Sequence, residues 1–219
     1  MKFNLAFAIE SLPLILSALW TTVWVTVASC AGAALLGFLL EITRRSSRAM
    51  SYVMRFVIDF IRSTPLLVQL YFLYFVLPFY GVTLPSFVVG IMGLSIYYSG
   101  YLAEVFKAGI DGIPVGQFEA AQSLGLKRLD VVVFVIAPQM LRNIAAPMGN
   151  YFVSILKATP YLAIIAVPEM LGEAMEIASD TFRYAEPMLT VGVVFLVLAV
   201  AVAQLVRLLE MRLLKSAKR

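Results

Sequence analysis

The chain contains no histidine and a single cysteine among its 219 residues. The absence of histidine removes the commonest metal ligand and the side chain that most often moves protons near neutral pH. One cysteine cannot form an internal disulfide, and Cys30 lies in an apolar stretch, where a small core residue is the ordinary interpretation. We therefore expect no metal site and no Cys/His catalysis in this chain.

Charge is also scarce. Only 14% of the residues are charged and 62% are hydrophobic, and the mean hydropathy is +0.93. Soluble domains have about 25% charged and about 45–50% apolar residues. A chain this apolar cannot cover a surface exposed to water, which argues against a soluble enzyme. The net charge is +4, but the basic residues lie mostly between apolar stretches, so we expect no nucleic-acid partner.

The chain contains three long stretches without a charged residue. They cover residues 11–40, 63–103 and 187–206, which is 30, 41 and 20 residues. A membrane-spanning helix needs about 20 apolar residues. The longest stretch is too long for one helix, and two prolines and a glycine in residues 78–85 mark a turn within it. The sequence predicts an all-α membrane protein of one domain, residues 1–219, with about five spans at residues 14–40, 64–77, 86–103, 144–168 and 188–206.

Lysine and arginine are distributed unevenly around these spans. Lys2 and Arg183 lie on one side, Lys157 lies within a span, and the other 14 of the 17 basic residues lie on the side of the C-terminus. Because basic residues accumulate in cytoplasmic loops, we expect a cytoplasmic C-terminus and an external N-terminus. The outer segment after the fourth span is interpreted either as a solvated loop or as a docking surface for an external partner; its acidic residues are Glu169, Glu173, Glu176, Asp180 and Glu186.

The loop between the third and fourth spans, about residues 107–142, predicts a short helix, a glycine turn and a second helix. Pro114 suits the first turn of a helix, and Gly125 suits the left-handed conformation that ends one. The second helical stretch covers residues 126–135 and is limited by Pro138. The first helix has an apolar face at helical spacing, which would lie on lipid or in a groove of a partner protein: Val115, Phe118, Ala121 and Leu124.

This loop also carries a recognisable motif. Glu119, Ala120 and Ala121, followed after three residues by Gly125, resemble the EAA loop in the membrane subunits of bacterial ABC importers. Residues 62–69, Arg-Ser-Thr-Pro-Leu-Leu-Val-Gln, are similar to the Arg-Gly-Thr-Pro-Leu-Leu-Val-Gln segment of the polar amino-acid permeases. The resemblance covers about residues 14–210 and includes further matches at Tyr101, Leu102, Ala103, Glu104, Gly109, Gly116, Gln117, Pro138, Gln139, Arg142, Asn150 and Lys157.

The resemblance implies a type I ABC importer permease in the bacterial inner membrane. The helix from Glu119 to Gly125 would dock on a cytoplasmic ATPase, which uses the ATP, since this chain has no Walker-type phosphate loop. A second permease subunit, identical or related, would complete the pathway within the lipid bilayer. A substrate-binding protein outside would deliver a polar amino acid or an amino-acid-like solute.

Lys157 is the one ionisable residue that we place inside a predicted span. A cation near the bilayer centre costs about 2.5–3.5 kcal/mol and usually faces the bundle interior with a partner. Snorkelling to the interface is the alternative interpretation. We place Lys157 in the substrate pathway, attracting a carboxylate, with Thr159 and Gln69 as further pathway residues. Pro160 is expected to kink or break this span.

The family comparison also bears on the substrate. Polar amino-acid permeases often have Lys-Asp-Thr-Ser where this chain has Lys157, Ala158, Thr159 and Pro160. An aspartate there would pair with an α-ammonium group. Its replacement favours a carboxylate solute without a free α-amino group, such as ectoine or an opine, unless a second, different permease supplies the acid. The rival functions are an ion-coupled secondary transporter, which would need carboxylates that these spans lack, and a membrane anchor.

Overall fold

The computed structural model describes residues 3–215, and all regular structure within that range is helical. The expectation of an all-helical membrane protein is confirmed. Lys2, Lys218 and Arg219, which entered the count of basic residues, lie outside the described residues. The longer helices are α1 (Leu5–Ser17), α2 (Leu19–Arg44), α3 (Arg48–Ser63), α5 (Ser86–Asp111), α8 (Ala137–Ala158), α9 (Met170–Thr181) and α10 (Ala185–Lys215). The shorter elements are α4 (Leu66–Tyr71), η1 (Phe72–Val76), η2 (Leu77–Tyr80), α6 (Val115–Ser123), α7 (Arg128–Asp130), η3 (Val131–Ile136) and η4 (Thr159–Ile165).

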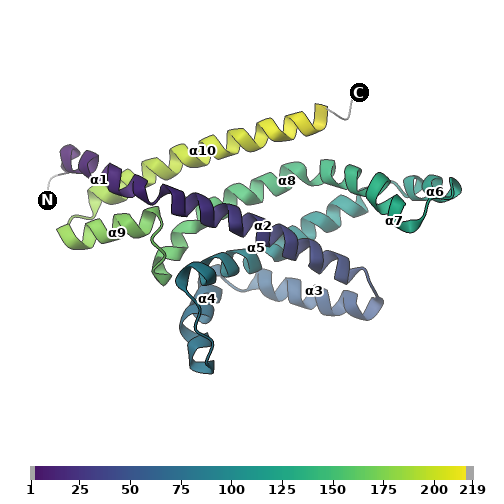
Figure 1. Cartoon of the computed structure of the whole chain (residues 1–219), viewed down its shortest axis with the longest axis horizontal. Helices are drawn as coiled ribbons and strands as arrows, with labels where there is room; N and C mark the ends of the chain where they lie inside the picture. The colour runs from purple at the N-terminus through teal and green to yellow at the C-terminus, as the bar shows by residue number, and fades with distance from the viewer. Residues whose placement is uncertain (1–2, 216–219) are drawn as a thin grey trace.

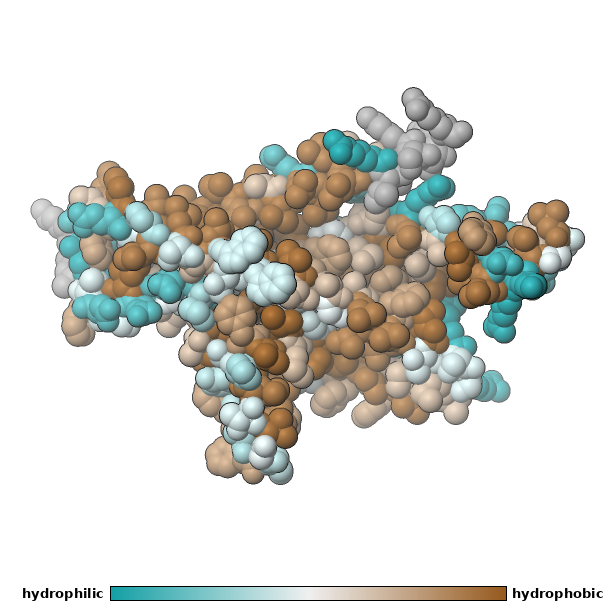
Figure 2. All heavy atoms as spheres, viewed as in Figure 1, coloured by the Kyte–Doolittle hydropathy of each residue, from teal (hydrophilic) through white to brown (hydrophobic). Residues whose placement is uncertain are grey.

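The long helices run roughly along the long axis of the molecule (Figure 1). Helix α5 packs on both α2 and α8, and α10 packs on α8 and α1. The two ends differ: α6 and α7 lie at one end, and α1 and α9 lie at the other, while α4 projects sideways (Figure 1). Hydrophobic residues dominate the middle of the face in Figure 2, and hydrophilic residues gather toward both ends, as expected of a bundle that crosses a membrane along this axis.

Four helical segments are long and apolar enough to cross a membrane: Leu19–Arg44, Ser86–Asp111, Arg128–Ile165 and Ala185–Arg212. A fifth span exists if Arg48–Ser63 and Leu66–Tyr80 are taken together, although they are bent by 98°. The predicted second span at residues 64–77 corresponds to the helical segment Leu66–Tyr80, but the arginine-rich residues before it, which were expected to form a loop, are helix α3. Pro65 disfavours helical backbone in the residue before it, and Thr64 is extended, with φ −92° and ψ 127°.

The predictions that helices end at Pro160 and at Pro138 have different outcomes. The predicted break at Pro160 is confirmed: α8 ends at Ala158, a 3₁₀ segment follows, and it stops at Ala166 with φ +57°. Pro138 does not end its helix, contrary to the prediction, since helical backbone continues past it from Arg128 to Ala158. The π-helical turn Val131–Ile136 directly precedes α8, and the change in hydrogen-bond spacing there accommodates the donor that Pro138 lacks.

The contact between α2 and α5 is the most extensive in the bundle. It is close because small residues line it: a Cβ atom on Gly37 would lie 2.9 Å from both Leu102 Cβ and the Ser99 carbonyl oxygen. Val25 and Ala33 on α2 are fully buried there. Small residues allow helix backbones to approach and gain dispersion contacts, which is the main source of helix association in lipid.

We expect Gly37→Ala to destabilise the protein by about 1–3 kcal/mol, because the added methyl group forces α2 and α5 apart. Thermal unfolding of the purified chain in detergent measures this. Gly192→Ala is the matched control, since a Cβ atom there meets nothing within 4 Å. Equal unfolding temperatures for the two variants would contradict the close-packing argument.

Candidate functional site

The predicted short helix and its glycine turn are confirmed as α6 and the residues after it. Pro114 immediately precedes the helix with φ −57° and ψ 135°, and Gly125 has φ +71°, a conformation that favours glycine. The Leu126 amide donates to the Ala121 carbonyl across this turn. The turn reverses the chain so that α7 leads back toward the bundle through η3 (Figure 1).

The apolar face expected on this helix divides into two parts. Ala121 is buried and Phe118 is half-buried against the main core, whereas Val115 and Leu124 are exposed. Glu119, Ala120 and Gly125 are also exposed. One side of helix α6 therefore packs on its own chain, and the side with Glu119 and Ala120 is exposed.

The predicted pathway residues Lys157 and Thr159 lie at the end of α8 but in different surroundings. Lys157 is exposed and lines a cavity of about 300 Å³ whose other lining residues are apolar, on η4, α9 and α10. None of the ion pairs within residues 3–215 includes it. Thr159 is fully buried, and its hydroxyl donates to the Leu156 carbonyl at 2.9 Å. The fold thus directs the lysine, and not the threonine, into open space.

Gln69 lies elsewhere, at the bend between α3 and α4. Its side-chain amide donates to the Ile61 carbonyl at 2.9 Å and to the Thr64 carbonyl at 3.3 Å. These bonds satisfy carbonyl groups that the helix break at Pro65 leaves without partners. The structure does not bring Gln69 together with Lys157.

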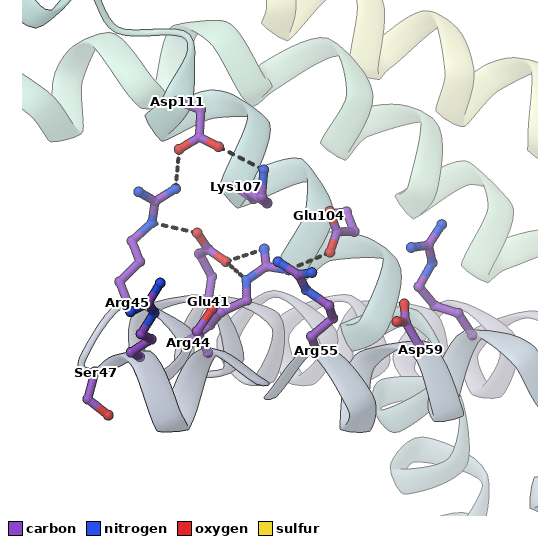
Figure 3. A pocket seen from close by; sticks show the side chains of 12 residues that line it. Glu41, Arg44, Arg45, Ser47, Arg55, Asp59, Glu104, Lys107 and Asp111 are labelled. Atoms are coloured by element: carbon purple, nitrogen blue, oxygen red, sulfur yellow. Dashed lines mark hydrogen bonds and ion pairs between the residues drawn. The ribbon is translucent and has the colours of Figure 1, made fainter. Parts of the chain in front are cut away.

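A charged cleft between α3 and α5 is the site that sequence reasoning missed (Figure 3). Its volume is about 570 Å³, and α2 closes one side. The sequence prediction assigned its arginines to a loop, where they served only to orient the chain. All of the lining residues are charged or serine: Glu41, Arg44, Arg45, Ser47, Arg48, Ser51, Arg55, Asp59, Arg62, Glu104, Lys107 and Asp111.

Six of the ten charged residues form a chain of ion pairs at one end of the cleft (Figure 3). Arg44 pairs with Glu41 and with Glu104, the latter at 2.6 Å. Arg45 pairs with Glu41 and with Asp111, each at 2.5 Å, and Lys107 reaches Asp111 at 2.8 Å. Glu41 and Arg44 are buried, so each needs the other to offset the cost of its desolvation. The network fastens the end of α2 to α5.

At the other end of the molecule, most of the expected acidic loop is a helix, α9, and the two acids outside it, Glu169 at its N-cap and Glu186 in α10, have structural roles. Glu169 accepts hydrogen bonds from the Leu171 and Gly172 amides and so caps α9. Glu186 pairs with Arg183 at 2.5 Å and accepts a hydrogen bond from the Asn4 amide, which joins α10 to the start of the chain. Of the five acids, Glu176 and Asp180 are exposed.

Burial raises the pKa of Glu169 to about 7, although the Leu171 and Gly172 amides oppose the shift. Because this pKa lies above the ordinary value of 4.5, the folded protein holds the proton more tightly than the unfolded chain. The stabilisation is complete below pH 4.5 and is lost as pH rises through about 7.

We therefore expect the unfolding temperature of the detergent-solubilised protein to fall between pH 5.5 and pH 8, through the titration of Glu169. Glu169→Gln keeps one acceptor for the helix cap and removes the titration, so its unfolding temperature should depend less on pH. The same pH dependence in both proteins would show that other groups cause it.

The fold and these sites define a class of protein: a polytopic, all-helical membrane subunit with a short exposed helix at one end and a charged cleft beside α2, α3 and α5. Residues 33–215 match the family of the "Binding-protein-dependent transport system inner membrane component". The chain belongs to this family.

Individual relatives agree with the family match. A probable amino-acid ABC transporter permease protein of Sinorhizobium fredii, y4tG, is 40% identical over 97% of this chain and 92% of its own length. The glutamine transport system permease protein GlnP of Escherichia coli is 30% identical over 97% of this chain and 99% of its own length. A crystal structure of an amino acid ABC transporter with histidines superposes with a TM-score of 0.89 at 33% identity, covering 97% of this chain and 100% of that one. The methionine transporter MetNI shares the fold, with a TM-score of 0.76 at 18% identity.

Membership of this family shows which subunit of the transporter the chain is. It is the multi-pass inner-membrane permease component of an ABC importer and not its ATPase. A binding-protein-dependent importer implies two kinds of partner, an ATPase and a substrate-binding protein. The expectation of a type I ABC importer fold is confirmed by the superposition.

Proposed function

We propose that this permease subunit imports a polar α-amino acid. The observation that carries the proposal is the crystal structure of the amino acid transporter with histidines, which matches nearly the whole chain at 33% identity. GlnP, a glutamine permease, gives the same substrate class. The names of these relatives do not mention ectoine or opines, so L-glutamine and L-histidine are the first substrates to test.

In the proposed assembly, the loop of about residues 107–142 binds the ATPase, which binds and hydrolyses ATP, at the exposed side of α6. The substrate-binding protein docks at the opposite end, where α9 exposes Glu176 and Asp180. A second permease subunit, identical or related, encloses the pathway with this one in the lipid bilayer. The C-terminus is cytoplasmic and the N-terminus external, as the distribution of lysine and arginine supports.

Reconstitution tests this function directly. The permease is reconstituted in proteoliposomes with the ATPase that co-purifies with it, and the binding protein is added. ATP is supplied on the side of the membrane where the ATPase lies, and uptake of labelled L-glutamine and L-histidine is measured. Uptake that requires both ATP and the ATPase supports the proposal. Uptake by the permease alone, driven by an ion gradient, would favour a secondary transporter, and assembly without any uptake would favour a membrane anchor.

Glu119 and Gly125 are expected to transmit the motion of the ATPase through α6. In Gly125→Val, a β-branched residue must adopt φ near +71°, which costs about 1–2 kcal/mol and reorients the end of α6. We expect this variant and Glu119→Ala to keep ATP hydrolysis while uptake falls about tenfold or more. Gly116→Ala is the control, since a Cβ atom there meets nothing within 4 Å. Unchanged uptake in both variants would count against the coupling role of α6.

Lys157 is proposed to attract the substrate carboxylate, with Thr159 and Gln69 supporting the backbone around the pathway. Because one charge-assisted contact contributes about 1.5–3 kcal/mol, Lys157→Ala should lower uptake about tenfold or more. Membrane insertion and ATPase binding should stay normal, and Lys157→Arg should retain most of the uptake. Normal uptake by Lys157→Ala would assign the lysine to the lipid interface.

A further inference from the structure

Helix α3 differs from the spans of the bundle because its basic and apolar residues lie on separate faces. Arg48, Arg55 and Arg62 recur at seven-residue spacing, which is about two helical turns, so they form one stripe along the helix. The four candidate spans do not include α3, which is apolar enough to cross a membrane only when it is taken together with Leu66–Tyr80. A helix with a basic face and an apolar face that is too polar to span is typical of segments that bind lipid at the membrane interface.

A second stripe on α3 is aromatic and open. Tyr52, Phe56 and Phe60 recur at four-residue spacing, which places side chains next to each other on one face of a helix. Their side chains are 64%, 72% and 62% exposed. Tyr52 follows Arg48 by four residues and precedes Arg55 by three, so it joins the aromatic stripe to the arginine stripe. Helix α3 therefore presents a basic stripe and an aromatic stripe side by side, and its own chain covers neither.

The basic stripe lacks counter-charges from the rest of the cleft. The carboxylates of α2 and α5 that line the cleft already pair with basic residues of those helices and of the turn after α2. None of the ion pairs within residues 3–215 includes the four charged residues that α3 contributes to the lining: Arg48, Arg55, Asp59 and Arg62. Arg55 extends from α3 into the cleft (Figure 3). Three cations and one carboxylate leave an excess of positive charge, so a complementary partner is anionic.

The position of α3 along the bundle corresponds to the depth of one lipid leaflet. Arg45, just before α3, pairs with Asp111, four residues before α6, so α3 begins at the end of the bundle that carries α6. The Arg62 guanidinium lies over the Tyr101 ring, 5.3 Å from its centroid. Tyr101 precedes Asp111 by ten residues, or about 15 Å along α5. Because half of the hydrocarbon core is also about 15 Å thick, α3 runs from the α6 end toward the middle of the bilayer.

The two stripes are therefore arranged in the order in which a phospholipid presents its own groups. Arg48 is nearest to the α6 end, and Phe60 lies twelve residues, or about 18 Å, further along α3. A phosphate held by Arg48 and Arg55 allows the acyl chains to run past Phe56 and Phe60 toward the middle of the bilayer. A water-soluble anion satisfies the guanidiniums but leaves the aromatic rings uncovered, whereas an anionic phospholipid satisfies both stripes.

We propose that α3 binds an anionic phospholipid, with the phosphate on Arg48 and Arg55 and the acyl chains on Tyr52, Phe56 and Phe60. A zwitterionic phospholipid brings its own cation and leaves the excess positive charge of α3 in place, so the site prefers an anionic headgroup. The bound lipid covers the aromatic stripe and neutralises the basic stripe next to the turn that joins α2 to α3. This lipid site is independent of the solute that the permease transports.

The test measures lipid binding by the purified permease–ATPase complex in detergent. Phosphatidylglycerol and phosphatidylcholine with the same acyl chains are titrated, and bound lipid is counted by native mass spectrometry. We expect Arg48→Gln and Arg55→Gln each to weaken binding of phosphatidylglycerol about fivefold and to change binding of phosphatidylcholine less than about twofold. Arg55→Lys should retain most of the affinity for phosphatidylglycerol. Phe56→Ala should weaken binding of both lipids, because their acyl chains are the same.

Matched controls remove the same groups elsewhere: Arg207→Gln on α10 and Phe79→Ala on η2 should leave lipid binding unchanged. An equal loss in Arg207→Gln and Arg55→Gln overturns the proposal, since net charge alone then explains the binding. Displacement of phosphatidylglycerol by glycerol 3-phosphate also overturns it, in favour of a site for a soluble phosphate. A change in the number of permease copies per complex in Phe56→Ala, with lipid binding intact, overturns it in favour of a contact between subunits.

Discussion

The close approach of α2 to α5 is the contact on which the rest of the structure depends. Gly37 brings the α2 backbone against Leu102 and Ser99, and the Glu41–Arg44 pair continues the same interface where it meets Glu104. Dispersion holds the apolar part, while the charged part is stable only because each buried ion has a partner. Helix α5 then serves as a common support, since α3 packs on one side of it and α8 on another.

This arrangement separates two tasks. Helix α6 is seated on the chain through Ala121 and Phe118, so a force applied to its exposed side is passed to η3 and α8. The break after Ala158 lies at the far end of α8, where Lys157 faces α9 and α10. The helical backbone from Arg128 to Ala158 thus links the surface proposed to bind the ATPase to the 3₁₀ segment that follows α8. In a rigid helix, movement at one end is transmitted to the other, which is what an ATP-driven permease requires.

Local signals in the sequence were sufficient for much of this. The uncharged stretches predicted most spans, and Gly125 and Pro160 predicted a turn and a break that both exist. The errors came from elements whose conformation depends on neighbours. Arginines at residues 48–62 suggested a loop, but they lie along the cleft-lining face of helix α3, which packs on α2 and α5 and buries Ile58. The acids after residue 168 also suggested a loop, because a cap such as Glu169 is recognised only when its amide partners are known.

The sequence by itself determined the class of protein and the family, because hydropathy, charge asymmetry and the Glu-Ala-Ala motif are properties of the chain read in order. The tertiary structure decided which polar groups share a site. Arg55 and Asp59 on α3 and Glu104 on α5 are more than 40 residues apart in sequence, and they line one cleft because both helices pack on α2. Ion pairing and burial depend on distances between such segments, and only the folded chain sets those distances.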